Sequence, residues 1–263
     1  MNGFEAVFLG VIQGVTEFLP VSSSGHLVLA EYFLHLEDGG LAFDVILHMG
    51  TLVAVLAYFY RDWMAMLLSV LPGKGNDASR RLLVLLIIGT VPGAVAGFLL
   101  EHAASTYFRS PWVVVCTLSG VALLLFLADR VARHARDFGR FGKGDAALVG
   151  LSQALAIVPG VSRSGITMTC ALFLGFTREA AARFSFLLSA PIIAGAGLYE
   201  TIKLIREGSS ALDINYLLGF LASIISGYLV IAFLMNYLKR HTFMPFVVYR
   251  LILAAIVAAV LVV

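Results

Sequence analysis

The residues best suited to chemistry lie where polar side chains interrupt an apolar segment near the amino terminus. Ser23 and His26 are three positions apart, so they share one face of a helix that begins at the serines. A hydroxyl beside an imidazole is the minimal activated nucleophile, and Glu17 is the candidate third group that would orient the imidazole. The structural alternative is a set of helix-capping serines beside a hydrogen-bonded core histidine.

Glu17 is unusual in its own right, because a carboxylate within an apolar helix is costly unless it is paired or hydrated. Gln13 lies one turn earlier on the same helical face. Glu17 is therefore a candidate metal ligand, or a base or orienting group for a neighbouring side chain. The alternative is that Gln13 and Glu17 form a structural polar pair inside a helix bundle.

A second interruption places a guanidinium in another apolar segment. Arg163 lies within Val158–Gly165 (VPGVSRSG), among glycines and hydroxyls, at the expected start of a short helix. Free N–H groups and the helix dipole favour an anion at such a position, and arginine matches phosphate with two parallel hydrogen bonds. Arg163 is therefore a candidate phosphate ligand. Its structural alternative is an ion pair with Glu17.

The two interruptions repeat each other, because Gly10–Gly25 aligns with Gly150–Gly165 without a gap. The amide, hydroxyl and glycine positions around the breaks are candidate substrate-binding groups: Gln13, Ser22, Ser24, Gly25, Ser162, Ser164 and Gly165. The copies differ where Ser23 aligns with Arg163 and where Glu17 aligns with Ile157. One copy would thus supply attack and proton transfer, while the other would hold the phosphate.

The composition predicts an integral membrane protein. Of the 263 residues, 60% are hydrophobic and 13% charged, with a mean hydropathy of +0.95, whereas soluble domains are about half apolar and a quarter charged. The net charge of +2 carries no information on partners, and no basic cluster is interleaved with aromatic residues, so nucleic-acid binding is not expected. The segments long enough to span a membrane as helices are 41–60, 82–101, 111–129, 180–203, 212–237 and 245–263.

Two further apolar segments, 4–35 and 146–176, are broken in the middle by proline, glycine and serine. Pro20 and Pro159 are each expected to end a helix, and non-helical backbone survives at membrane depth only inside protein or beside a wet cavity. We therefore expect an all-α membrane protein with six transmembrane helices and two re-entrant helical hairpins.

The chain is expected to form a single membrane domain, 1–263, built from inverted repeats at about 1–135 and 141–263, since each half has one hairpin and three spans. Most basic residues outside the spans fall on one side, which is then cytoplasmic. Both termini and the first hairpin would lie outside, the second hairpin would enter from the cytoplasm, and the site would open outward.

Other polar residues within the spans are expected to be structural. Asp44 and His48 are expected to support the site or to join helices. Arg250 lies near the end of a span, and we expect its side chain to snorkel toward the membrane surface.

The two interruptions resemble the signature motifs of the bacterial undecaprenyl pyrophosphate phosphatases of the bacitracin-resistance type. The resemblance is carried by Gln13 and Glu17 with Pro20–His26 (PVSSSGH), and by Pro159–Gly165 (PGVSRSG). It extends to Phe43–Thr51 and Phe184–Pro191, and so spans most of the chain. The first motif of that family has Glu or Gln followed by Glu, and this chain has the Gln version.

The resemblance implies hydrolysis of undecaprenyl diphosphate to the monophosphate, which recycles the carrier lipid of cell-wall synthesis, and resistance to bacitracin. It places the family's catalytic residues on Glu17, Ser23, His26 and Arg163. It also implies a divalent cation, Mg²⁺ or Ca²⁺, a location in the bacterial inner membrane, and a polyprenyl diphosphate substrate among membrane lipids. A homodimer is a possible assembly. The alternative function is a secondary transporter or lipid flippase, because paired broken helices are typical of inverted-repeat transporters.

Overall fold

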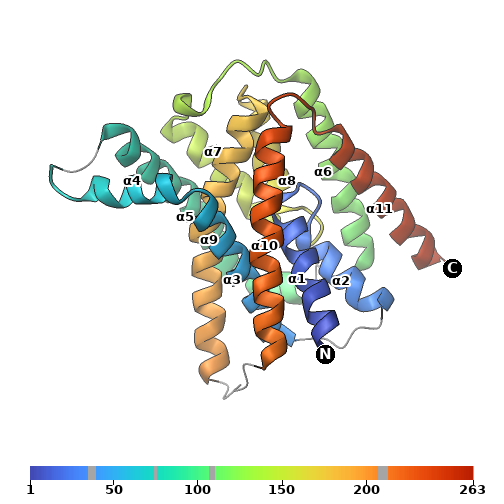
Figure 1. The fold of residues 1–263 in the computed structure, drawn as a ribbon. Coiled ribbons are helices and arrows are strands. Elements are labelled where there is room, and N and C mark those ends of the chain that lie inside the picture. The colour runs from blue at the N-terminus through green and yellow to red at the C-terminus, as the bar shows by residue number, and fades with distance from the viewer. Residues whose placement is uncertain (35–39, 74–75, 107–109, 207–212, 263) are drawn as a thin grey trace.

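A computed structural model describes residues 1–34, 40–73, 76–106, 110–206 and 213–262. These residues form an all-helical bundle whose one exception to helix and loop is an isolated bridge between Arg136 and Phe176 (Figure 1). The elements are α1 Gly3–Phe18, α2 Ser23–Leu34, α3 Gly40–Tyr58, α4 Tyr60–Val70, α5 Asp77–Thr106, α6 Pro111–Val131, η1 Phe138–Arg140, α7 Lys143–Ala154, η2 Leu155–Ile157, α8 Arg163–Phe173, α9 Arg178–Arg206, α10 Ile214–Tyr237 and α11 Met244–Val262.

Five helices in the described parts of the chain, α5, α6, α9, α10 and α11, are long and apolar enough to cross a membrane. A sixth span is reached only if α3 and α4 are taken together, and these two helices are bent by 79° at their junction. The protein is therefore a multi-pass membrane protein with five or six spans. Each of the six predicted spans falls on one of these helices, with 41–60 on α3.

Both predicted breaks are present. α1 ends at Phe18 and α2 begins at Ser23, so the first break contains Pro20. α7 is followed by the short helix η2, and α8 begins only at Arg163, so the second break contains Pro159. Each broken segment thus consists of a longer helix, a short irregular stretch and a second helix, as the sequence predicted.

Close backbone contacts place the first limb of each broken segment. A Cβ atom on Gly10 of α1 would collide with the carbonyl oxygen of Gly219 in α10. A Cβ atom on Gly150 of α7 would likewise collide with the carbonyl oxygen of Gly89 in α5. Glycines allow helices to approach this closely within a membrane. The aligned positions Gly10 and Gly150 therefore have equivalent packing roles.

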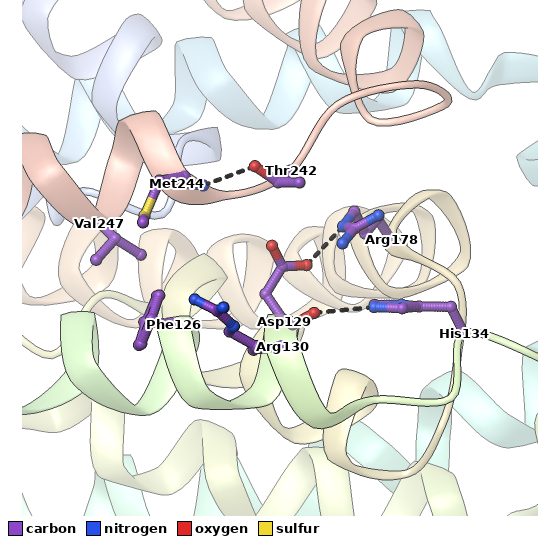
Figure 2. Close-up of a pocket in the computed structure, with 8 residues that line it drawn as sticks. All are labelled: Phe126, Asp129, Arg130, His134, Arg178, Thr242, Met244 and Val247. Atoms are coloured by element: carbon purple, nitrogen blue, oxygen red, sulfur yellow. Dashed lines mark hydrogen bonds and ion pairs between the residues drawn. The ribbon is translucent and has the colours of Figure 1, made fainter.

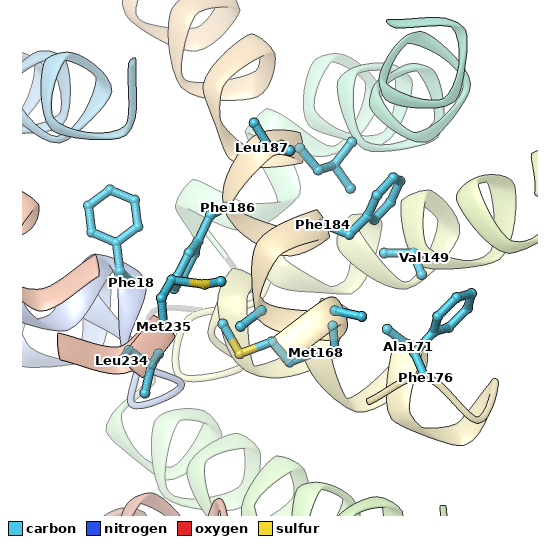
Figure 3. Close-up of a cluster of buried hydrophobic side chains, with 14 of the residues drawn as sticks. Phe18, Val149, Met168, Ala171, Phe176, Phe184, Phe186, Leu187, Leu234 and Met235 are labelled. Atoms are coloured by element: carbon cyan, nitrogen blue, oxygen red, sulfur yellow. The ribbon is translucent and has the colours of Figure 1, made fainter. Parts of the chain in front are cut away.

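The main buried cluster surrounds α9 and ties both broken segments to it (Figure 3). Phe184 and Phe186 of α9 are fully buried, and the ring of Phe186 meets that of Phe18 edge to face with centroids 5.4 Å apart. Met168 of α8 lies in the same cluster. Because Phe18 directly follows Glu17, this aromatic contact fixes the end of α1 next to the polar break.

Candidate active site

The structure brings the two breaks together. The Ser164 hydroxyl donates to the carbonyl oxygen of Leu19 at 2.8 Å, which joins the start of α8 to the end of α1. The Arg163 guanidinium donates through Nη2 to Glu17 Oε1 at 2.5 Å. The two interruptions therefore meet through direct side-chain contacts, and the ion pair between Arg163 and Glu17, the structural alternative for Arg163, is present.

The two breaks share a left-handed serine at aligned positions. Ser22 and Ser162 both adopt a left-handed φ, of 79° and 71°. Each hydroxyl accepts a hydrogen bond from the backbone N–H three residues later: Gly25 at 3.4 Å in the first break and Gly165 at 3.1 Å in the second. A left-handed φ is costly for a serine, so the surrounding contacts must hold both turns in place. The predicted capping by the serines is confirmed.

Glu17 is the centre of the site, with 7% of its side chain exposed. Its Oε2 accepts hydrogen bonds from Ser23 Oγ at 2.5 Å and from Gln13 Nε2 at 3.0 Å. Arg163 occupies Oε1, and His48 Nε2 lies 3.8 Å from Oε2. The carboxylate is thus balanced by a guanidinium and is placed to take a proton from the Ser23 hydroxyl.

The predicted orientation of His26 by Glu17 is wrong. His26 Nδ1 lies 2.7 Å from the carbonyl oxygen of Ser22, which can only accept, so Nδ1 carries the proton. Nε2 is then the acceptor for the Tyr249 hydroxyl at 2.6 Å, and the two rings stack with centroids 5.5 Å apart. Ser23 bonds to Glu17 instead of His26, because the imidazole folds back one helical turn onto the Ser22 carbonyl.

Arg163 keeps one donor group for a ligand. Its side chain is 14% exposed, and Nη2 is taken by Glu17. Nη1 is buried and has no hydrogen-bond partner among the described residues. A buried donor of a charged group is expensive to leave unpaired, so this atom marks a position where an anion would be stabilised.

The remaining predicted binding groups differ in whether their hydrogen-bonding atoms are already used within the protein. The Ser164 hydroxyl is used on Leu19, and the Ser22 and Ser162 hydroxyls cap the helices that begin at the breaks. Ser24 is exposed, with its hydroxyl 3.4 Å from that of Ser22. The buried Gly25 and Gly165 donate their N–H groups to the capping serines, so their part is to shape the turns.

Arg250 occupies a place that the sequence reading missed. Instead of snorkelling, its side chain is fully buried and donates to five carbonyl oxygens. These oxygens belong to both breaks and to α6: Pro20 at 3.1 Å, Gly160 at 2.8 Å, Val161 at 3.2 Å, Thr117 at 3.3 Å and Leu118 at 3.1 Å. Irregular backbone needs such donors at membrane depth. The missed signal was the one used for Arg163, a guanidinium within an apolar segment.

His48 and Tyr249 are further residues at the site. His48 was expected only as a supporting contact, yet it faces Glu17 while its Nδ1 donates to the Asp44 carbonyl at 2.8 Å. No sequence signal connects α3 with α1, or Tyr249 with His26. These contacts depend on how distant helices pack.

The fit of a divalent cation rests on two oxygens. The described residues contain no group of three or more His, Cys, Asp or Glu side chains that could hold a metal ion. Glu17 supplies one carboxylate, and Gln13 Oε1 is a buried amide oxygen with no hydrogen-bond partner among the described residues. Mg²⁺ binds readily through one or two protein oxygens when phosphate oxygens complete its shell. The residues thus fit a cation that arrives with a diphosphate.

Comparison with known proteins gives concordant results. A family model described as "Bacitracin resistance protein BacA" matches residues 6–256. The chain is 48% identical over 260 residues to a protein of Moorella thermoacetica named undecaprenyl-diphosphatase, covering 99% of this chain and 98% of the relative. A protein of the same name from Rubrobacter xylanophilus is 49% identical over 265 residues, covering 98% and 97%. One from Desulforudis audaxviator is 47% identical over 260 residues, covering 99% and 98%.

Proposed function

This chain belongs to the bacitracin resistance protein BacA family, and we propose that it hydrolyses undecaprenyl diphosphate to undecaprenyl phosphate and inorganic phosphate. The reaction would recycle the carrier lipid of cell-wall synthesis and confer resistance to bacitracin. The observation that carries the proposal is the unpaired Nη1 of Arg163, beside a carboxylate that accepts a hydrogen bond from the Ser23 hydroxyl. An anion-binding donor next to an activated hydroxyl is what phosphoryl transfer requires.

The mechanism uses the contacts at the junction of the two breaks. Arg163 holds the terminal phosphate, and Ser23 Oγ either attacks its phosphorus or holds the water that attacks. As the new O–P bond forms, the proton passes to Glu17 and the bridging P–O bond breaks, which releases the lipid monophosphate. If Ser23 attacks, a water then cleaves the phosphoserine, frees inorganic phosphate and restores the hydroxyl. His26 remains a proton carrier in this proposal, acting through the Tyr249 hydroxyl.

A divalent cation, Mg²⁺ or Ca²⁺, belongs to the proposal. Glu17 and the amide oxygen of Gln13 are the protein oxygens that would hold it. When bound with the substrate, the cation would neutralise charge on the diphosphate.

The inverted repeat is supported by the packing of the two halves. α1 packs on α10 and α7 packs on α5, through the aligned glycines Gly10 and Gly150. We place both termini and the first hairpin on the outer side of the bacterial inner membrane, with the site opening outward and the isoprenoid tail against the spans. The basic residues support this orientation, since most of them lie in segments assigned to the opposite side: Arg61, Lys74, Arg80, Arg81, Arg130, Arg133, Arg136, Arg140, Lys143, Arg178, Arg183, Lys239 and Arg240.

Phosphate release from a purified polyprenyl diphosphate tests the function and the site together. Wild-type protein should liberate inorganic phosphate, and Ser23→Ala and Arg163→Ala should each abolish the release. Ser152→Ala is the matched control, because this hydroxyl donates to the Val149 carbonyl at 2.7 Å and contacts the Cys170 thiol, neither of which is a residue assigned to the site. Full hydrolysis by both site variants would reject the assigned residues.

The transporter alternative makes the opposite prediction. The names of the relatives describe a diphosphatase and do not favour it. In vesicles, a transporter would move the diphosphate lipid between leaflets with no phosphate release. A wild-type protein that behaves in this way would overturn the proposed hydrolysis.

A further inference from the structure

A cavity lined by both charged and apolar residues lies at the end of α6 that is remote from the two breaks (Figure 2). Its volume is about 440 Å³, and its walls come from the end of α6, the start of α9 and the start of α11. Leu118, which meets Arg250 near the breaks, and Arg130, which lines the cavity, are separated by about 18 Å along the helix axis. The cavity is therefore distinct from the proposed active site.

One wall of the cavity carries cationic groups with free donors. Arg130 is exposed, lies with its guanidinium carbon 5.7 Å from the centroid of the Phe126 ring, and forms no hydrogen bond or ion pair within the described chain. Arg178 uses only Nε, on Asp129 Oδ1 at 2.5 Å. Each oxygen of Asp129 then has one partner, because its Oδ2 accepts the backbone N–H of Phe243 at 3.1 Å. The remaining guanidinium donors favour an anionic ligand.

His134 adds a requirement for a hydrogen-bond donor. Its Nε2 lies 3.0 Å from the carbonyl oxygen of Asp129, which can only accept, so Nε2 carries the proton. The other ring nitrogen, Nδ1, is buried and has no partner among the described residues. With its proton on Nε2, the neutral tautomer presents an unused lone pair at Nδ1. A ligand that pairs with the arginines and with His134 needs an anionic group for the former and a hydroxyl for the latter.

The rest of the lining is apolar and continues onto the outer surface of the helices. Phe126 and Val247 line the cavity, and large apolar side chains on the same two helices are exposed, among them Leu123, Leu127 and Ile252. In a spanning helix such a surface faces lipid. A ligand with a polar head in the cavity could thus lay hydrocarbon chains along α6 and α11.

We propose that this cavity binds the head group of an anionic phospholipid that carries a free hydroxyl, of the phosphatidylglycerol type. The phosphodiester would accept from Arg130 and Arg178, and the glycerol hydroxyl would donate to His134 Nδ1. Basic pockets between helix ends are known to hold anionic head groups in this way. The inference does not depend on the reaction at the breaks.

Native mass spectrometry of delipidated protein, titrated with phosphatidylglycerol and phosphatidylcholine of identical chains, tests the charge requirement. Wild type should prefer phosphatidylglycerol, and Arg130→Gln should weaken its binding about tenfold, the effect of one lost charged hydrogen bond. Arg133→Gln is the matched control, because Arg133 is equally exposed and close by but does not line the cavity. It should stay within about twofold of wild type. Equal binding of both lipids, or equal losses in both variants, would overturn the proposal.

Two further measurements test the role of the head-group hydroxyl and whether the bound phosphate belongs to a lipid or is free in solution. Phosphatidylmethanol has the same charge but no head-group hydroxyl, so it should bind more weakly than phosphatidylglycerol, and His134→Leu should abolish that difference. Inorganic phosphate at millimolar concentration should leave the lipid bound. Displacement of phosphatidylglycerol by inorganic phosphate would assign the cavity to the free anion and reject the lipid.

Discussion

Glu17 determines the chemistry of the site at the residue scale, because Gln13, Ser23 and Arg163 all donate to its carboxylate. Glu17→Gln keeps the shape but removes both the proton acceptor and the charge that balances Arg163. We expect the rate of phosphate release to fall at least about 100-fold, the usual contribution of a general base. A variant that folds with a normal melting temperature yet keeps more than a tenth of the rate would exclude Glu17 as the base.

The contact between His26 and Tyr249 gives a second prediction at this scale. Tyr249→Phe removes the hydroxyl that meets His26 Nε2 and leaves the ring stacking in place. We expect kcat to fall about tenfold with KM unchanged, because only the positioning of the imidazole is lost. Tyr228→Phe is the control, since the Tyr228 ring contacts Tyr58 and its hydroxyl forms no hydrogen bond with the described residues. If His26→Ala is inactive while Tyr249→Phe matches wild type, His26 does not act through the tyrosine.

At the scale of the elements, glycines let helices pack closely and so position the residues of the site. Gly10→Ala would push α1 from α10, since the new Cβ meets the backbone of Gly219, and it would displace the end of α1 that carries Glu17. We expect a loss of about 1–3 kcal/mol in stability, typical of overpacking, together with reduced hydrolysis. Thermal unfolding in detergent measures the first effect and phosphate release the second.

Gly120→Ala supplies the control for this substitution. Gly120 lies within α6, and a Cβ atom there has nothing within 4 Å, so alanine should be neutral or slightly stabilising because it suits a helix better than glycine. If the two variants lose equal stability, the effect of Gly10→Ala does not come from the close approach of α1 to α10.

The elements were largely predictable because length and hydropathy identify spans, and because proline and serine mark helix ends. The left-handed turns at Ser22 and Ser162 show that the internal repeat also carries local geometry. α4 was not predicted, since the 79° bend at its junction with α3 has no proline or glycine to mark it. Buried and exposed residues recur along α4 at helical spacing, with Met66 buried and Leu67 and Val70 exposed, but a search for long apolar spans does not use that periodicity.

Contacts between helices that are distant in the sequence could not be predicted at the site. Glu17, Ser23 and Arg163 were placed correctly because two aligned motifs had to meet. The prediction of the partner of His26 was wrong because Tyr249 is 223 positions away in the sequence and is not part of either motif. The prediction for Arg250 was wrong for a related reason. Its partners are backbone carbonyls, which cannot be recognised from the types of the neighbouring side chains.

At the scale of the whole molecule, Arg250 joins the two halves, since one side chain of α11 bonds the backbone of both breaks and of α6. Removing it leaves several buried carbonyls without donors, so Arg250→Met should cost about 3–5 kcal/mol and lower stability and hydrolysis together. Arg163→Lys keeps a positive charge beside Glu17 but loses the second guanidinium donor, so it should abolish hydrolysis with a much smaller loss of stability. Melting temperature and phosphate release, measured on both variants, separate these roles. If Arg163→Lys hydrolyses the substrate as fast as wild type, the second donor of Arg163 does not bind the phosphate, and the phosphate site must lie elsewhere.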